Sequence, residues 1–353
     1  MTEERGSRIV SGQRRESGNV GRSSRLDPRS SSVWHHRYVK FVTVFTVLLI
    51  AAGGMVTSTD SGLSVPDWPT TYGWNMFTFP LSKWVGGIRY EHSHRLIAST
   101  VGFLTIIMAA WTWWAEPRRW VRRLAFAALG AVILQGVLGG LTVLFFLPAP
   151  ISIGHAALAQ VFFCLTLTLA VVTSPRWKHT VSPVDDPMLR RVAGLTTLLI
   201  YTQILLGATM RHTNAGLAIP DFPWAFGHAI PPVWNARVAI HFAHRVGALI
   251  VTMSILATTG HVFYHHGARR ELVRPAVALL LFLAMQVTLG AFVIWSGKDP
   301  VINTAHVVNG ALVLGTSLVL TLRSFRAGFE GLVQPVIHPY VDTPDRHALG
   351  VRP

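Results

Sequence analysis

The sequence predicts an all-α membrane protein with eight transmembrane helices, arranged as two tandem four-helix bundles. Half of the 353 residues are apolar, only 13% are charged, and the mean hydropathy is +0.41. A soluble protein carries about twice that share of charge. Apolar runs near the roughly 20 residues that cross a bilayer recur eight times. Since lipid offers the backbone no hydrogen-bond partners, these runs are expected to be helices.

The expected spans follow one another with short connections on one side and two long connections on the other. Polar, Arg- and Ser-rich segments flank them, and residues 1–34 show no apolar periodicity, as in a disordered tail. Acidic residues in that tail argue against an organelle transit peptide. In chain order the spans lie near residues 39–57, 93–114, 122–147, 151–173, 190–210, 239–260, 275–295 and 301–323.

These spans divide the chain into five segments. A tail is expected over 1–38, a first bundle over 39–173, a linker over 174–189, a second bundle over 190–323 and a tail over 324–353. The long connections, about 58–90 and 211–238, are rich in Trp, Pro, Gly and Phe, a composition suited to lid-like loops at the membrane interface. Each half therefore has one elaborate loop, and both loops fall on the same face.

The positive charge behind the net +15 lies mostly on one side of the expected membrane spans. The two tails and the connections on one side hold 24 of the 31 Lys and Arg residues. Basic residues mark the cytoplasmic side of membrane proteins, so both termini are expected in the cytoplasm. This distribution excludes a nucleic-acid-binding role. We expect a multi-pass protein of the lipid bilayer, with the plasma membrane of a bacterium favoured over the mitochondrial inner membrane.

An internal repeat relates the two halves. The end of the first span and the loop after it match the end of the fifth span and its loop at an offset of 154 residues. Gln135 in the third span matches Gln286 in the seventh at an offset of 151. Such matches indicate a duplication of four spans. An even number of spans keeps both copies in the same orientation, unlike the inverted repeats of many transporters. The loop residues that recur are Gly53, Thr59, Gly62, Leu63, Pro66, Asp67 and Pro69.

Four histidines stand one to each even-numbered span: His94, His155, His244 and His306. A histidine inside a membrane span indicates function, although any one of them could be a hydrogen-bonded core residue. With a rise of about 1.5 Å per residue, all four are expected at a similar depth. Two imidazoles facing each other across a bundle suit a haem iron. A zinc site needs three or four ligands, and neither half offers a cysteine partner, because Cys164 is alone.

The two histidine motifs differ at one position. Glu91 precedes His94 and Arg95 by three and four residues, so all three share a helix face. Glu91 can be a structural anion paired with Arg95, or a carboxylate that moves protons beside His94. The second copy has His241 instead, as expected if one site reacts and the other carries electrons. The three arginines near the outer ends suit either haem propionates or interfacial snorkelling: Arg95, Arg211 and Arg245.

Together these motifs resemble the haem A synthase family over residues 39–323. The resemblance rests on Thr59-Asp60-Ser61-Gly62-Leu63-Ser64, Glu91-His92-Ser93-His94-Arg95, Gly154-His155-Ala156-Ala157-Leu158-Ala159-Gln160, and His244-Arg245 with His306. It implies stepwise oxidation of a ring methyl of haem O, through an alcohol, to a formyl group. It also implies haem O synthase and terminal oxidase assembly as partners.

The resemblance further implies a role for each site residue. His94 and His155, with Arg95, are expected to bind haem O, and Glu91 is the family's essential acid. The second half is expected to hold a haem b cofactor between its two histidines, with Arg245 and Arg211 nearby.

Two departures from the family stand in the first half. Val65 and Thr71 lie roughly where many bacterial members carry a cysteine pair, so a role for those thiols cannot apply here. Thr57 stands where the family often has Arg, whereas the second half keeps Arg211. Contacts to the substrate propionates are therefore expected to differ from those of other members.

Two rival functions fit part of the pattern. A membrane subunit that moves electrons through two haem b groups would use the same four histidines, but it explains neither the Glu91/His241 difference nor the lid-like loops. A transporter would fit the parallel repeat poorly. The electron acceptor, the oxygen source (water or dioxygen) and the oligomeric state, including a homo-oligomer, stay open at this point.

Overall fold

The computed structural model describes residues 28–175, 177 and 184–326. Most of each expected tail, residues 1–27 and 327–353, lies outside the described residues. Residues 176 and 178–183 of the expected linker lie outside them as well. Within them the chain is helical, with two isolated β-bridges in the long loops and no β-sheet. The all-α prediction is confirmed.

Eight helices are long enough and apolar enough to cross a membrane, as predicted. Two 3-10 turns, η1 (Met76–Thr78) and η2 (Leu81–Lys83), lie in the first long loop. The long helices are α1 (Pro28–Ser58), α2 (Ile88–Ala115), α3 (Arg119–Leu144), α4 (Ala149–Val172), α6 (Pro187–His212), α7 (Ala236–His266), α8 (Arg270–Trp295) and α9 (Pro300–Ser324).

Several helix boundaries differ from those expected, and two of the differences have a clear cause. Helix α1 begins at Pro28 rather than near residue 39, so the last part of the expected tail is helical. The extra turns dock on α2, because the Tyr38 hydroxyl donates to the Leu104 carbonyl at 2.9 Å. The third span ends at Leu144 instead of residue 147, because Phe146 and Leu147 have φ values of 58° and 60° and turn the chain away from the helical path.

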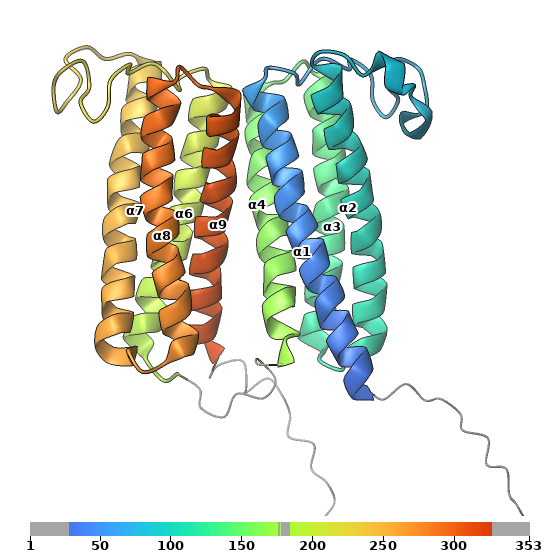
Figure 1. Cartoon of the computed structure of the whole chain (residues 1–353), viewed down its shortest axis with the longest axis vertical. Helices are drawn as coiled ribbons and strands as arrows, with labels where there is room; N and C mark the ends of the chain where they lie inside the picture. The colour runs from blue at the N-terminus through green and yellow to red at the C-terminus, as the bar shows by residue number, and fades with distance from the viewer. Residues whose placement is uncertain (1–27, 176, 178–183, 327–353) are drawn as a thin grey trace, which may run out of the picture.

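The eight helices form two bundles that stand side by side (Figure 1), one from α1–α4 and the other from α6–α9. They meet along α1 with α9 and along α4 with α6 and α9. Small residues allow this close approach: a methyl group added at Gly315 of α9 would lie 2.9 Å from the Phe163 ring of α4. Both long loops lie at one end of the bundles, and the described chain ends lie at the other.

Large apolar side chains cover the outside of both bundles, as lipid contact requires. Phe103 on α2, Leu249 on α7 and Leu281 on α8 are each more than 60% exposed in the isolated chain. Polar caps set several helix starts, since Asp186, Asn235 and Asp299 accept backbone N–H groups of α6, α7 and α9.

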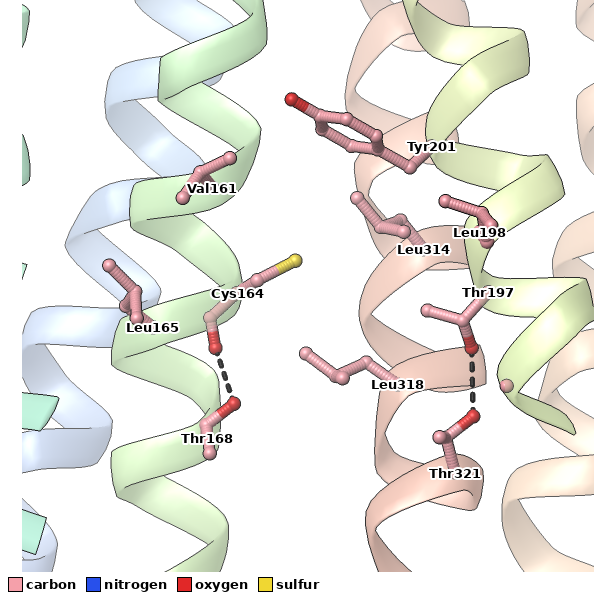
Figure 2. A pocket seen from close by; sticks show the side chains of 11 residues that line it. Val161, Cys164, Leu165, Thr168, Thr197, Leu198, Tyr201, Leu314, Leu318 and Thr321 are labelled. Atoms are coloured by element: carbon pink, nitrogen blue, oxygen red, sulfur yellow. Dashed lines mark hydrogen bonds between the residues drawn. The ribbon is translucent and has the colours of Figure 1, made fainter. Parts of the chain in front are cut away.

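A mostly apolar cavity of about 390 Å³ lies between the two bundles, lined by α4, α6 and α9. The Cys164 sulfur points into it from α4, opposite Tyr201 of α6 (Figure 2). Cys164 therefore stands at the interface between the bundles. Thr197 and Thr321 close one end with a hydroxyl–hydroxyl hydrogen bond of 2.8 Å.

The topology yields a labelling prediction, since Cys164 is the only cysteine. In a Cys164→Ala background, we expect Val85→Cys, in the first long loop, to react with an impermeant maleimide in intact cells. Asp185→Cys, at the opposite end, should react only after the membrane is permeabilised. Equal labelling of both variants in intact cells would contradict the placement of these loops on opposite faces.

Candidate functional site

The four histidines occupy equivalent places in their helices. Each lies near the helix end that is on the same side of the bundles as the long loops. His94, His155 and His306 are each the seventh residue of their helix, and His244 is the ninth. All four side chains are partly buried. His94 lies within electrostatic range of His155, and His244 within that of His306. Each bundle thus brings its two imidazoles together from α2 and α4, or from α7 and α9.

A glycine on the preceding helix faces each of these imidazoles. A Cβ atom added to Gly53 or Gly207 would stand 3.0 Å from Cε1 of His94 or His244. Such contacts are tighter than nearly all real Cβ contacts, so a larger residue would require the ring to shift by a few tenths of an ångström. The same pairing occurs between Gly139 and His155 at 3.2 Å and between Gly290 and His306 at 3.1 Å.

Glutamines on neighbouring helices hold the histidine backbones. Gln135 Nε2 donates to the His155 carbonyl at 2.9 Å, and Gln286 Nε2 donates to the His306 carbonyl at 3.2 Å. In the second bundle Gln203 Nε2 also donates to the His244 carbonyl at 2.7 Å and lies 3.0 Å from His244 Nδ1. The second site is therefore more heavily hydrogen-bonded than the first.

Three of the four imidazoles leave a buried ring nitrogen without a partner in the described part of the chain, whereas Nδ1 of His244 lies beside Gln203. Among the described residues, buried Nδ1 atoms without a hydrogen-bond partner occur on His94, His155 and His306. Buried polar atoms are normally paired, and an unpaired one indicates a water, an ion or a ligand. Among the residues that the structure describes, no carboxylate or cysteine forms a metal-ligand group with either pair. A pair of imidazoles from facing helices in an apolar bundle fits axial ligation of a haem iron.

The first long loop is clamped onto α2 by the acidic motif. The Glu91 carboxylate accepts from the Val65 N–H at 2.8 Å and pairs with Arg95 at 2.6 Å. Arg95 donates to the carbonyls of Val65, Asp67 and Thr70 at 2.6–3.0 Å. Glu91 is only 3% exposed, so its pairing with Arg95, one of its two expected roles, is present in the fold. Charge-assisted bonds of this kind are the stronger ones.

The second half repeats this clamp with one substitution. Arg245 donates to the carbonyls of Ile219, Asp221 and Trp224, each 154 residues after its counterpart in the first loop. His241 replaces Glu91, and its Nδ1 accepts from the Ile219 N–H at 3.1 Å. The loop geometry is therefore kept without an acid, as the predicted duplication leads one to expect.

Each loop also holds an internal turn around an aspartate. The Asp67 carboxylate accepts from the Tyr72 and Gly73 N–H groups, and Asp221 accepts from those of Phe226 and Gly227. Burial opposes ionisation of Asp67, but these bonds outweigh it and lower the pKa of its carboxyl. Hydrogen bonds, first of all from Gly227, likewise lower the pKa of Asp221. Both turns therefore stay anchored by carboxylates at neutral pH.

The first loop covers the first bundle with aromatic side chains. Trp68 lies against α3, where a methyl group added to Gly140 would stand 2.5 Å from the indole ring. His92, on α2, is 1% exposed and bonds Thr71 through Nδ1 at 3.1 Å. Phe79 packs on the His92 ring at a centroid distance of 5.0 Å. The expected lid is thus attached to the helix that carries His94.

The arginines predicted near the sites lie in two kinds of place. The guanidinium groups of Arg95 and Arg245 donate hydrogen bonds to backbone carbonyls of the long loops. Arg211, at the end of α6, reaches the other bundle and donates to the Gly54 carbonyl and the Ser58 hydroxyl, both at 2.8 Å. Contact of any of them with a haem propionate stays a prediction.

Sequence reasoning gave no role to the three glutamines. The recurrence of Gln135 and Gln286 at the histidine offset was a usable signal for two of them. The first-half residue that corresponds to Gln203 is Leu49, so the internal repeat gave no signal for Gln203.

Comparison with known proteins identifies the family of this chain. Residues 75–318 match the family model COX15-CtaA, described as cytochrome oxidase assembly protein. A Heme A synthase of Symbiobacterium thermophilum is 30% identical over 70% of this chain and 82% of its own length. Those of Shouchella clausii and of an Exiguobacterium species are each 29% identical, over 73% and 81% of this chain and 87% and 92% of their own lengths.

The matched region contains all four histidines, Glu91 and both bundles apart from α1. It extends over more than half of the chain, and these three relatives are aligned over most of their own length. The family expected from the motifs is confirmed, and with it the class of oxidoreductases of haem A biosynthesis. This chain belongs to the COX15-CtaA family of cytochrome oxidase assembly proteins, the haem A synthase family.

Proposed function

We propose that this protein is a bacterial haem A synthase that oxidises a ring methyl of haem O, through an alcohol, to a formyl group. The observation that carries the proposal is the pair of imidazoles in each bundle, each ring seated against a glycine. Two such sites provide one place for a substrate haem and one for a haem cofactor. Family membership supplies the class of reaction.

The second bundle is assigned the haem b cofactor. His244 and His306 would hold the iron, and Gln203 and Gln286 fix the backbones that carry them. When bound, haem b supplies one-electron transfer. Ligands that are held by several hydrogen bonds suit a resident group, because preorganisation lowers the cost of binding.

The first bundle is assigned the substrate. His94 and His155 would hold haem O beneath the loop that carries Trp68. Only Gln135 supports this site, so its ligands are less constrained than those of the second bundle. Fewer hydrogen bonds to the ligand helices suit a site that must take up a substrate and release a product. The clamped aromatic loop restricts access of water to the reacting methyl.

Glu91 is assigned the proton chemistry of the first site. Both oxidation steps involve proton transfer, whether the oxygen comes from water or from dioxygen. Glu91 is a buried carboxylate on the helix of His94, one turn away. Its second-half counterpart His241 performs the same loop contact without an acid. The loop clamp therefore does not require a carboxylate, and its presence in one half only supports a chemical role there.

The bias of basic residues supports cytoplasmic termini and places both haem sites near the outer face. The family description supports a link to oxidase assembly, with haem O synthase as the supplier of substrate. The rival function, electron transfer through two haem b groups, would leave no place for haem O. Pigment analysis separates the two functions.

Removal of either second-bundle ligand tests the site assignment. We expect His244→Ala or His306→Ala to lose the tightly held haem b and all formation of haem A. His94→Ala should keep haem b and lose haem O binding. The measurement is chromatography of the pigments extracted from each purified variant. If the wild-type protein is supplied with haem O and still contains haem b as its sole pigment, the result would support the electron-transfer rival.

The two roles of Glu91 are separable by substitution. Glu91→Gln and Glu91→His keep an acceptor for the Val65 N–H, and the second copies the residue at position 241. We expect both variants to keep haem b and the loop but to form haem A at least about 100-fold more slowly, the usual size of an acid–base contribution. Normal turnover by Glu91→His would show that Glu91 serves only as a loop anchor.

The glycine contacts predict an effect on cofactor affinity. Gly207→Ala puts a Cβ atom 3.0 Å from the His244 ring, so overpacking of about 1–3 kcal/mol should weaken haem b binding roughly 5- to 150-fold. Gly260→Ala on α7 meets open space and is the matched control. Haem titration of the stripped proteins measures both. Equal affinities for the two variants would contradict the seating of His244 against Gly207.

A further inference from the structure

A second histidine cluster lies at the end of the second bundle opposite the haem sites. Nε2 of His261 and Nε2 of His266 each lie 2.8 Å from the same oxygen, Oδ2 of Asp186. The three ligand atoms lie within 4.8 Å of one another. All three side chains are 14–18% exposed, so the cluster is partly shielded yet open to the solvent side.

The fold brings these residues together from two helix ends. Asp186 caps the first turn of α6, and its Oδ1 accepts from the Leu189 N–H at 2.8 Å. His261 and His266 stand in the last two turns of α7, which runs antiparallel to α6. The Leu189 bond fixes the carboxylate and leaves Oδ2 to the imidazoles. The nearby Arg190 is directed to Asp185 instead.

The donor set is that of a transition-metal site. Two imidazole nitrogens and a carboxylate oxygen bind Zn²⁺ in many proteins, with water as the fourth ligand. A carboxylate held by a backbone N–H is the outer support that metal ligands usually have. Burial raises the pKa of the Asp186 carboxyl, but hydrogen bonds from His261, Leu189 and His266 outweigh it and leave the carboxyl ionised at neutral pH.

We propose that Asp186, His261 and His266 bind a divalent transition metal of the zinc class, which joins the start of α6 to the end of α7. The site lies across the bundle from the haem pair of His244 and His306, and shares no ligand with it. The metal would act as a clamp at the base of the helices that carry Gln203 and His244. This role is independent of the haem chemistry.

The test uses the full-length protein with its haem, purified without a polyhistidine tag, stripped with a chelator and dialysed against buffered Zn²⁺. Zinc per chain is measured by mass spectrometry. We expect wild type to hold about one zinc ion per chain more than His261→Ala or His266→Ala does. The affinity of each variant for zinc should be lowered at least about 10- to 100-fold relative to wild type. Asp186→Asn keeps an equally good helix cap while losing the charge, so it tests the ligand without removing the cap.

His228→Ala is the control, because His228 is an exposed histidine in the loop between α6 and α7, at the other end of the bundle. It should bind zinc as wild type does. The haem absorption spectrum verifies the fold of every variant, and zinc X-ray absorption should show only nitrogen and oxygen neighbours at about 2.0–2.2 Å. Equal zinc binding by wild type and the cluster variants, or sulfur in the zinc shell, would overturn the proposal.

Discussion

The contact between a glycine backbone and an imidazole ring is the constraint on which both bundles depend. Each of the four histidine rings sits against a glycine of the preceding helix, where a Cβ atom would stand only 3.0–3.2 Å from the ring. These glycines are Gly53, Gly139, Gly207 and Gly290. Because each glycine stands on the helix that precedes its histidine, the contact also fixes which helices pack as pairs.

The two halves share a frame and differ in what they add to it. Both use an arginine to gather three loop carbonyls, and both tie the loop to the helix at the fourth residue before that arginine. An acid stands there in the first half and a histidine in the second. The second half adds Gln203 to its ligand support. A firmly supported pair without an acid fits a resident electron carrier, and a lightly supported pair beside a buried acid fits a site of turnover.

Hydropathy and repetition in the sequence predicted most of the fold. The eight spans appear in order, and the repeated motifs indicated which histidines belong to one bundle. The start of α1 was misjudged because its early turns are rich in serine and histidine rather than apolar residues. In the fold these turns dock on α2, where the Tyr38 hydroxyl donates to the Leu104 carbonyl. Arg95 could not be placed, since its loop carbonyls come from residues 25–30 positions away, and only the folded loop brings them together. The Asp186 cluster joins residues 75 and 80 positions apart and has no counterpart in the first half to signal it.

The central claim is that each bundle clasps one iron porphyrin between two imidazoles and that only the first does chemistry. An electron cryo-microscopy map of the protein supplied with haem O tests it most directly. We predict one porphyrin between His94 and His155, with Glu91 at its edge, and a second between His244 and His306. A map in which either pair of imidazoles turns away from a common ring, or in which haem O occupies the second bundle, would contradict the account.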